Sequence, residues 1–91
     1  MKVKDGFLLR EIAGRFMAVP YGSRTSEMHG MVALNETAAY LWRKLEQGSS
    51  EAELKAALLD EYEVTEADAA ECVADFLKTL QDENILAEEE G

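Results

Sequence analysis

The stretch that decides the fold reads Leu34-Asn35-Glu36-Thr37-Ala38-Ala39-Tyr40-Leu41-Trp42-Arg43-Lys44-Leu45. Asn35 is typical of a helix N-cap, because its side-chain oxygen can accept a hydrogen bond from the first helical turn. Apolar residues then recur at the i, i+3, i+4 and i+7 spacing of one helical face: Ala38, Leu41, Trp42 and Leu45. Gly48 ends this pattern. The sequence therefore predicts a helix that begins at Glu36 and buries one face.

The residues before this helix indicate strands. Residues 7–12 and 15–21 are two apolar-rich runs, and Gly14 in the turn between them can adopt a positive φ, which favours a hairpin. Pro20 has no backbone N–H to donate, so it predicts an edge position or the end of a strand. The second run places three residues on one face at the period of two that strands have: Met17, Val19 and Tyr21.

A third strand is predicted directly before the helix. Residues 22–27 are polar and indicate a loop, and residues 28–34 then form an apolar run in which Val32 and Leu34 share a face. Gly30 weakens the strand locally and allows another backbone to approach closely.

Two more helices follow. Ser50 and Glu53 have the spacing of a capping box, which predicts a helix from there to about Tyr62. Thr65 is a suitable N-cap for the next helix, which is expected to run to about Asp82. The acidic first turn of that helix is favoured by the helix dipole.

Length and composition limit the class of protein. The chain has 91 residues, of which 47% are hydrophobic and 31% are charged, and this length suits a single domain over 1–91. We expect a core over about 6–87, with residues 85–86 packed back onto it and an acidic tail at 88–91. The single cysteine allows no internal disulfide and suits a reducing cytoplasm. No apolar run approaches the roughly 18 residues of a membrane span, so no membrane partner is expected.

The charge is divided unevenly along the chain. The net charge is −10, and residues 49–91 hold fourteen acidic residues against two basic ones. Nucleic-acid binding depends on contacts between basic side chains and phosphates, so a DNA-binding role for the third helix is disfavoured. The acids of this helix either favour a basic partner or serve solubility; they are Glu66, Asp68, Glu71, Asp75 and Asp82.

The sequence offers few catalytic groups. His29 and Cys72 are the only histidine and cysteine, and no second ligand stands near either at the spacing of a metal site. No nucleotide-binding or hydrolase motif occurs, and we predict no enzyme activity, no metal and no cofactor. A thiol enzyme that uses Cys72 is the remaining catalytic alternative, against a small buried cysteine in the core.

The apolar arc of the third helix is unusually wide. At 100° per residue it covers about 160°, whereas a helix that rests on one core needs a stripe somewhat above 100°. Either the helix packs between two neighbours, or one edge of the arc lines an open groove. The arc includes Ala69, Cys72, Val73, Phe76, Leu77 and Leu80.

These features together resemble the PqqD family. The matching segments are Gly6-Phe7-Leu8-Leu9-Arg10-Glu11-Ile12-Ala13-Gly14, Gly30-Met31-Val32-Ala33 and Leu34-Asn35-Glu36-Thr37-Ala38, followed by Leu41-Trp42. The order of strands and helices matches as well, over about residues 6–87.

The resemblance implies an α+β, winged-helix-like fold, with a three-stranded antiparallel N-terminal sheet followed by three helices. It also implies a non-catalytic peptide chaperone, or precursor-peptide recognition element. Such domains bind the leader segment of a ribosomally synthesised precursor peptide and present it to a modifying enzyme. The namesake serves pyrroloquinoline quinone biosynthesis with a radical SAM enzyme, and relatives serve other peptide pathways. The segment LREIAG at 9–14 is closer to those relatives.

In the family the leader adds a strand to the third strand, in the groove between that strand and the third helix. An open strand edge offers N–H and C=O groups to such a partner. The same edge would also allow a homodimer or an adaptor role. The implied peptide site comprises Met28, His29, Gly30, Met31, Val32, Ala33 and Leu34 of the strand and Ala69, Cys72, Val73, Phe76, Leu77 and Leu80 of the helix.

Overall fold

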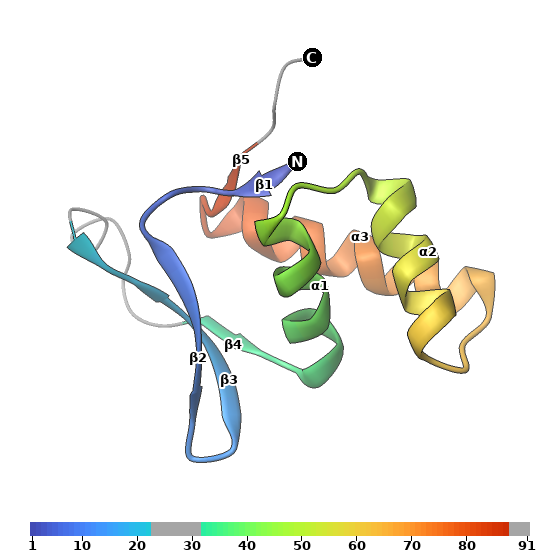
Figure 1. The fold of residues 1–91 in the computed structure, drawn as a ribbon, viewed down its shortest axis with the longest axis horizontal. Helices are drawn as coiled ribbons and strands as arrows, with labels where there is room; N and C mark the ends of the chain where they lie inside the picture. Colours follow the sequence, from blue (N-terminus) through green and yellow to red (C-terminus); the bar gives the residue numbers. More distant parts are fainter. Residues whose placement is uncertain (23–31, 88–91) are drawn as a thin grey trace.

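The computed structural model describes residues 1–22 and 32–87. Within these residues, β2, β3 and β4 form an antiparallel sheet, three helices follow, and β1 pairs with β5 in a separate two-stranded sheet (Figure 1). The α+β class, the three-stranded sheet and the three helices are thereby confirmed. The elements are β1 (Lys2–Val3), β2 (Phe7–Ile12), β3 (Arg15–Pro20), β4 (Val32–Leu34), α1 (Glu36–Glu46), α2 (Glu51–Glu61), α3 (Glu66–Asp82) and β5 (Leu86–Ala87).

The predicted hairpin joins β2 to β3 through a two-residue turn. Ile12 pairs with Arg15, and both turn residues have positive φ, 53° at Ala13 and 79° at Gly14. Two consecutive positive φ angles are the mark of a type I′ turn, whose twist matches that of the strands. Gly14 adopts this geometry freely, whereas the Cβ of Ala13 makes it unfavourable there.

Pro20 lies at the end of a strand and not at the edge of the sheet. β3 is the central strand of the order β2-β3-β4, and Pro20 is its last residue. The described pairing with β4 covers Phe16 to Ala18, so the missing N–H of Pro20 interrupts no hydrogen bond of that ladder.

The two faces of the sheet differ in burial. Phe7, Ala18 and Leu34 are buried on the face that meets the helices, which Figure 1 shows gathered on one side of the sheet. Residues directly opposite one another across paired strands share a face. Side chains alternate along a strand, so Met17 and Val19, which flank buried Ala18 on β3, lie on the outer face. These two residues thus share one face, as their spacing of two predicts.

All three predicted helix caps are present. Asn35 Oδ1 accepts from the N–H of Ala38 at 2.8 Å, and Thr65 Oγ1 accepts from the N–H of Asp68 at 3.1 Å. Ser50 and Glu53 form the reciprocal bonds of a capping box, at 3.1 and 2.9 Å; the full set of cap residues is Asn35, Ser50, Glu53 and Thr65. Each bond satisfies an N–H of a first turn that has no partner within its helix.

Helix α1 lies at the centre of the core. Leu41, Trp42 and Leu45 are fully buried, as the i, i+3, i+4, i+7 pattern predicts. The indole N–H of Trp42 has no hydrogen-bond partner among the described residues, so this side chain contributes through its apolar bulk. No helix in the described part of the chain has both the length and the apolar character needed to cross a membrane.

The chain ends meet in the β1–β5 ladder, which the sequence patterns did not predict. Val3 pairs with Leu86, and the N–H of Lys4 donates to the carbonyl of Ile85 at 2.8 Å. The side chain of Ile85 is fully buried, which confirms that residues 85–86 pack back onto the core. The ladder holds the end of α3 against the start of the chain.

Candidate functional site

A hollow of about 190 Å³ lies between β4 and α3. The β4 side and the start of α1 supply one wall, and α3 supplies the other. We call this hollow the β4–α3 groove; it is lined by Ala33, Leu34, Asn35, Ala38, Cys72, Asp75, Phe76 and Thr79.

The hydrogen-bond pattern of the hairpin fixes which backbone groups of β3 point toward β4. The N–H of Tyr21 donates to the carbonyl of Gly6 at 2.8 Å, which makes these two residues a hydrogen-bonded pair. Hydrogen-bonded and non-hydrogen-bonded pairs alternate along an antiparallel ladder. Met17 therefore directs its N–H and C=O toward β2, and its neighbours Phe16 and Ala18 direct theirs toward β4.

The same alternation shows which backbone groups of β4 point away from β3. Ala33 stands opposite Met17, in the non-hydrogen-bonded position of the β3–β4 pair, so its N–H and C=O point away from β3. Among the described strands β4 forms an edge of the sheet, and Ala33 is exposed and lines the β4–α3 groove. Ala33 thus places one donor and one acceptor at the mouth of this groove.

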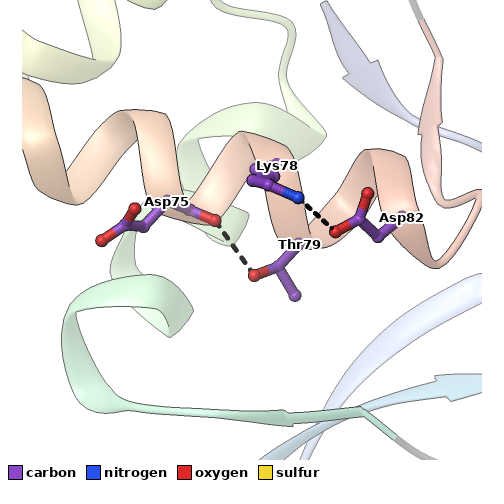
Figure 2. Close-up of polar contacts among 4 residues, drawn as sticks. All are labelled: Asp75, Lys78, Thr79 and Asp82. Carbon is purple, nitrogen blue, oxygen red and sulfur yellow. Dashed lines mark hydrogen bonds and ion pairs between the residues drawn. The ribbon is translucent and has the colours of Figure 1, made fainter.

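The α3 wall combines an apolar base with a polar rim. Phe76 forms the base, with only 4% of its surface exposed, and Cys72 beside it is half-buried. Thr79 Oγ1 donates to the backbone carbonyl of Asp75 at 3.0 Å, and its side chain points from α3 toward β4 (Figure 2). Asp75, one helical turn earlier on α3, also lines the groove.

A second hollow of about 200 Å³ adjoins the groove at Cys72, which lines both. It lies among the start of α1, the end of α2 and the start of α3. Its walls are mostly apolar, and its lining residues are Thr37, Leu58, Tyr62, Val64, Asp68, Ala69 and Cys72. Tyr62 meets the ring of Tyr40 edge-on at 5.6 Å, and burial raises the pKa of the Tyr62 hydroxyl.

The environment of Cys72 is opposite to that of a catalytic thiol. Burial, followed by the negative charges of Asp75 and Glu71, raises the pKa of the Cys72 thiol. A reactive cysteine instead needs an electropositive setting that lowers the pKa and produces the thiolate. This finding disfavours the thiol-enzyme alternative, while His29, its only candidate base, lies outside the described residues.

Within residues 1–22 and 32–87, no three side chains of His, Cys, Asp or Glu are grouped so that they could hold a metal ion.

The structure distributes the described residues of the predicted peptide site among the groove, the second hollow and the core. Ala33, Leu34, Cys72 and Phe76 line the β4–α3 groove, half-buried Val32 precedes them on β4, and Ala69 lines the second hollow. The predicted contacts Val73, Leu77 and Leu80 are buried in the hydrophobic core and line neither hollow, so the proposed site omits them. Residues 28–31, which were predicted as Met28, His29, Gly30 and Met31 of the site, lie outside the described residues.

Four groove residues were absent from the predicted set: Asn35, Ala38, Asp75 and Thr79. The sequence predicts Asn35 only as the N-cap of α1 and Ala38 only as part of its buried face. Thr79 carried a usable signal, because at 100° per residue it lies about 20° from Cys72 on the helix. A polar residue beside the apolar arc is the pattern expected where one edge of the arc is open.

Two features account for the wide apolar arc of α3: the helix packs between two neighbours, and one edge of the arc lines a groove. Its buried residues meet α1 and α2, so the helix does pack between two neighbours. Its Cys72–Phe76 edge nevertheless lines the groove beside β4. Within the described residues, the fold and site thus define a small α+β domain in which a strand at the sheet edge lies next to a partly apolar groove.

The profile of the family described as "Coenzyme PQQ synthesis protein D (PqqD)" matches residues 22–86. The chain belongs to the PqqD family, as the LNETA segment and the order of elements suggested. Among curated proteins, none matches the sequence.

Two solved structures share the fold. One is TbiB1 in complex with the TbiA(beta) leader peptide, with a TM-score of 0.76 and 21% identity over 100% of both chains. The other is lasso peptide synthetase B1 complexed with the leader peptide, with a TM-score of 0.73 and 22% identity over 96% of both chains. At these identities the likeness establishes the fold.

Proposed function

We propose that this chain is a non-catalytic recognition domain, single over 1–91, that binds an extended leader segment of a ribosomally made precursor peptide. The observation that carries the proposal is the placement of Ala33. Its outward N–H and C=O stand at the edge of β4, beside a groove with an apolar base at Phe76. The two solved structures of the same fold hold leader peptides, which supports this occupant.

The mode of binding is strand addition. An extended peptide pairs with β4 through backbone hydrogen bonds, each of which contributes about 0.5–1.5 kcal/mol net. Its alternate side chains face α3, where the Phe76 base and the apolar second hollow receive apolar anchors. Backbone pairing supplies affinity for many sequences, and these hollows supply the selection among them.

β2 forms the other edge of the described sheet. The hollow near its start is lined largely by polar groups, among them Lys4, Asp5 and Glu46. An apolar side chain gains little from such walls, because it would displace water from charged groups. The β4 edge is therefore the site we favour.

The proposed role places the domain in the cytoplasm between a precursor peptide and its modifying enzyme. A radical SAM maturase is one such enzyme, as in the pathway of the family's namesake. The domain itself needs no cofactor for this role, because its task is to hold the leader while the enzyme acts on the remainder of the precursor.

The test is a selection of random linear 15-residue peptides by mRNA display on the immobilised protein, followed by calorimetry with the selected peptides. The proposal predicts recovery of binding peptides with one-to-one stoichiometry and a shared apolar pattern of period two. Sedimentation with and without a selected peptide examines the homodimer alternative, since a peptide that binds the β4 edge would dissociate a dimer paired there. Failure to enrich any peptide would contradict the proposed function.

A further inference from the structure

We infer that the peptide segment held in the β4–α3 groove carries a lysine or arginine side chain opposite Asp75. This inference rests on the proposed function and adds the chemistry of the occupant. It is carried by Asp75 and Thr79, which line the α3 side of the groove.

Two other acids of α3 already have lysine partners. Glu66, at the start of the helix, lies 3.3 Å from the ammonium group of Lys55 on α2. Asp82, at its end, lies 2.9 Å from the ammonium group of Lys78, one helical turn away (Figure 2). One carboxylate near each end of α3 is thus paired with a lysine.

Asp68 and Asp75 line the second hollow and the groove, respectively. Asp68 lies in the first turn of α3, where the unpaired N–H groups of the helix end favour a negative charge. Asp75 lies in the middle of the helix, where the dipole gives no such support. Among the described residues no cation pairs with the Asp75 carboxylate. Within residues 1–22 and 32–87, Asp75 is therefore the acid of the β4–α3 groove that has no cationic partner.

The hydrogen bond of Thr79 determines whether its hydroxyl can donate or accept on the groove side. Its hydroxyl proton is donated to the backbone carbonyl of Asp75, so Thr79 Oγ1 is left as an acceptor toward the groove. The carboxylate of Asp75 offers further hydrogen-bond acceptors. A ligand side chain that pairs with the Asp75 carboxylate must supply hydrogen-bond donors, and an ammonium or guanidinium group does so with opposite charge.

The negative charge of Asp75 also acts inside the groove. The pKa of the Cys72 thiol at the groove base is raised by burial and then by the charge of Asp75. Asp75 is exposed in the free protein, and a peptide paired with Ala33 would cover it and exclude water. A charge pair formed there is screened less than one on an open surface.

The experiment compares peptide selections on wild type, Asp75→Asn and Asp60→Asn. Asp60 is an exposed acid on α2, away from the groove, so Asp60→Asn makes the same charge change and serves as the matched control. We expect lysine or arginine to be enriched at a fixed distance from an apolar anchor on wild type and Asp60→Asn. We expect this enrichment to disappear on Asp75→Asn. Far-UV circular dichroism and thermal melting check that both variants fold.

Calorimetry with one selected peptide then completes a double-mutant cycle. Asp75→Asn should weaken binding about five- to tenfold, and replacing the peptide cation by glutamine should do the same without adding to it. Binding peptides that lack a fixed cation, or cation enrichment that persists on Asp75→Asn, would overturn the inference while leaving the proposed function intact. A selection that yields no binder would contradict the proposed function, and the inference with it.

Discussion

Ala33 on β4 and Phe76 on α3 line the same hollow from opposite walls. Ala33 contributes backbone groups that point away from β3, and Phe76 contributes an apolar ring that is only 4% exposed. A chain that pairs with the first therefore has alternate side chains directed toward the second. This relationship divides the binding energy between a backbone term that tolerates many sequences and a side-chain term that selects among them.

Ala33→Pro should weaken the binding of a selected peptide at least fivefold, because it removes the one N–H of Ala33 that faces the groove. The N–H groups of Phe16 and Ala18, which point toward β4 from the central strand, are unchanged. The measurement is calorimetric titration, with circular dichroism as the check of folding.

Ala33→Thr is the matched control, since threonine keeps the N–H and suits an exposed strand position. It should bind within about twofold of wild type, an effect of a few tenths of a kcal/mol. Equal affinity of the folded proline and threonine variants would show that the N–H of Ala33 takes no part in binding.

The single cysteine reports the charge of Asp75 directly. Burial and the neighbouring acids, Asp75 before Glu71, raise the pKa of the Cys72 thiol, so the thiolate fraction is small at pH 8. Asp75→Asn removes one of these charges, lowers that pKa and should increase the rate of alkylation by iodoacetamide. Stopped aliquots analysed by intact mass spectrometry give the rate.

Asp60→Asn is again the control and should leave the alkylation rate unchanged. A selected peptide bound in the groove should protect Cys72 from alkylation in wild type, because Cys72 lines the groove. If alkylation proceeds at the free rate under saturating peptide, the peptide binds elsewhere.

Ala13→Asn should stabilise the protein by about 1 kcal/mol. Ala13 has a φ of 53°, which its Cβ makes unfavourable, whereas asparagine accepts this region and Asn-Gly is the preferred type I′ turn. The measurement is the free energy of unfolding in urea. The turn lies outside the residues that line the groove, so peptide affinity should not change. A lower stability of Ala13→Asn would contradict the assigned turn type.

The capping box of α2 predicts a dependence of stability on pH. Bonds from the backbone N–H and then the hydroxyl of Ser50 lower the pKa of Glu53 below 4.5. The contribution of the ionised Glu53 side chain to the free energy of unfolding is therefore fully present above pH 4.5. It is lost as the pH falls through the pKa that Glu53 has in the folded protein. Glu53→Gln keeps an acceptor for the N–H of Ser50 at every pH. Urea titrations should show the stability of wild type falling relative to Glu53→Gln only in acid, and parallel curves down to pH 3 would contradict the pairing.

The local features of the fold could be predicted from the sequence because their signals lie within one turn or one strand. Asn35, Ser50 and Thr65 cap the helices as predicted, and the apolar spacing after Asn35 places Leu41 and Leu45 in the core. The β1–β5 ladder could not be predicted, since a two-residue strand has no periodicity and its partner is more than eighty positions away.

The hollow between β4 and α3 is lined by only part of the predicted peptide site. Helical periodicity gives the direction of each side chain but not the element it meets. Val73 and Leu80 share the apolar arc with Cys72, and only the packing of α3 against its neighbours shows that they belong to the core. Thr79 is absent from the predicted set because that set was chosen by apolar character, although the helical angle of Thr79 places it beside Cys72.

Nuclear magnetic resonance of the ¹⁵N-labelled protein with a selected peptide tests the central claim most directly. The amide of Ala33 faces the groove, so on binding it should shift, exchange more slowly with deuterium and show nuclear Overhauser contacts to the peptide backbone. The amides of Phe16 and Ala18, which point toward β4 already, should exchange at nearly unchanged rates. Peptide contacts confined to β2 or to the outer face of the sheet, with the Ala33 amide still exchanging freely, would contradict strand addition at β4.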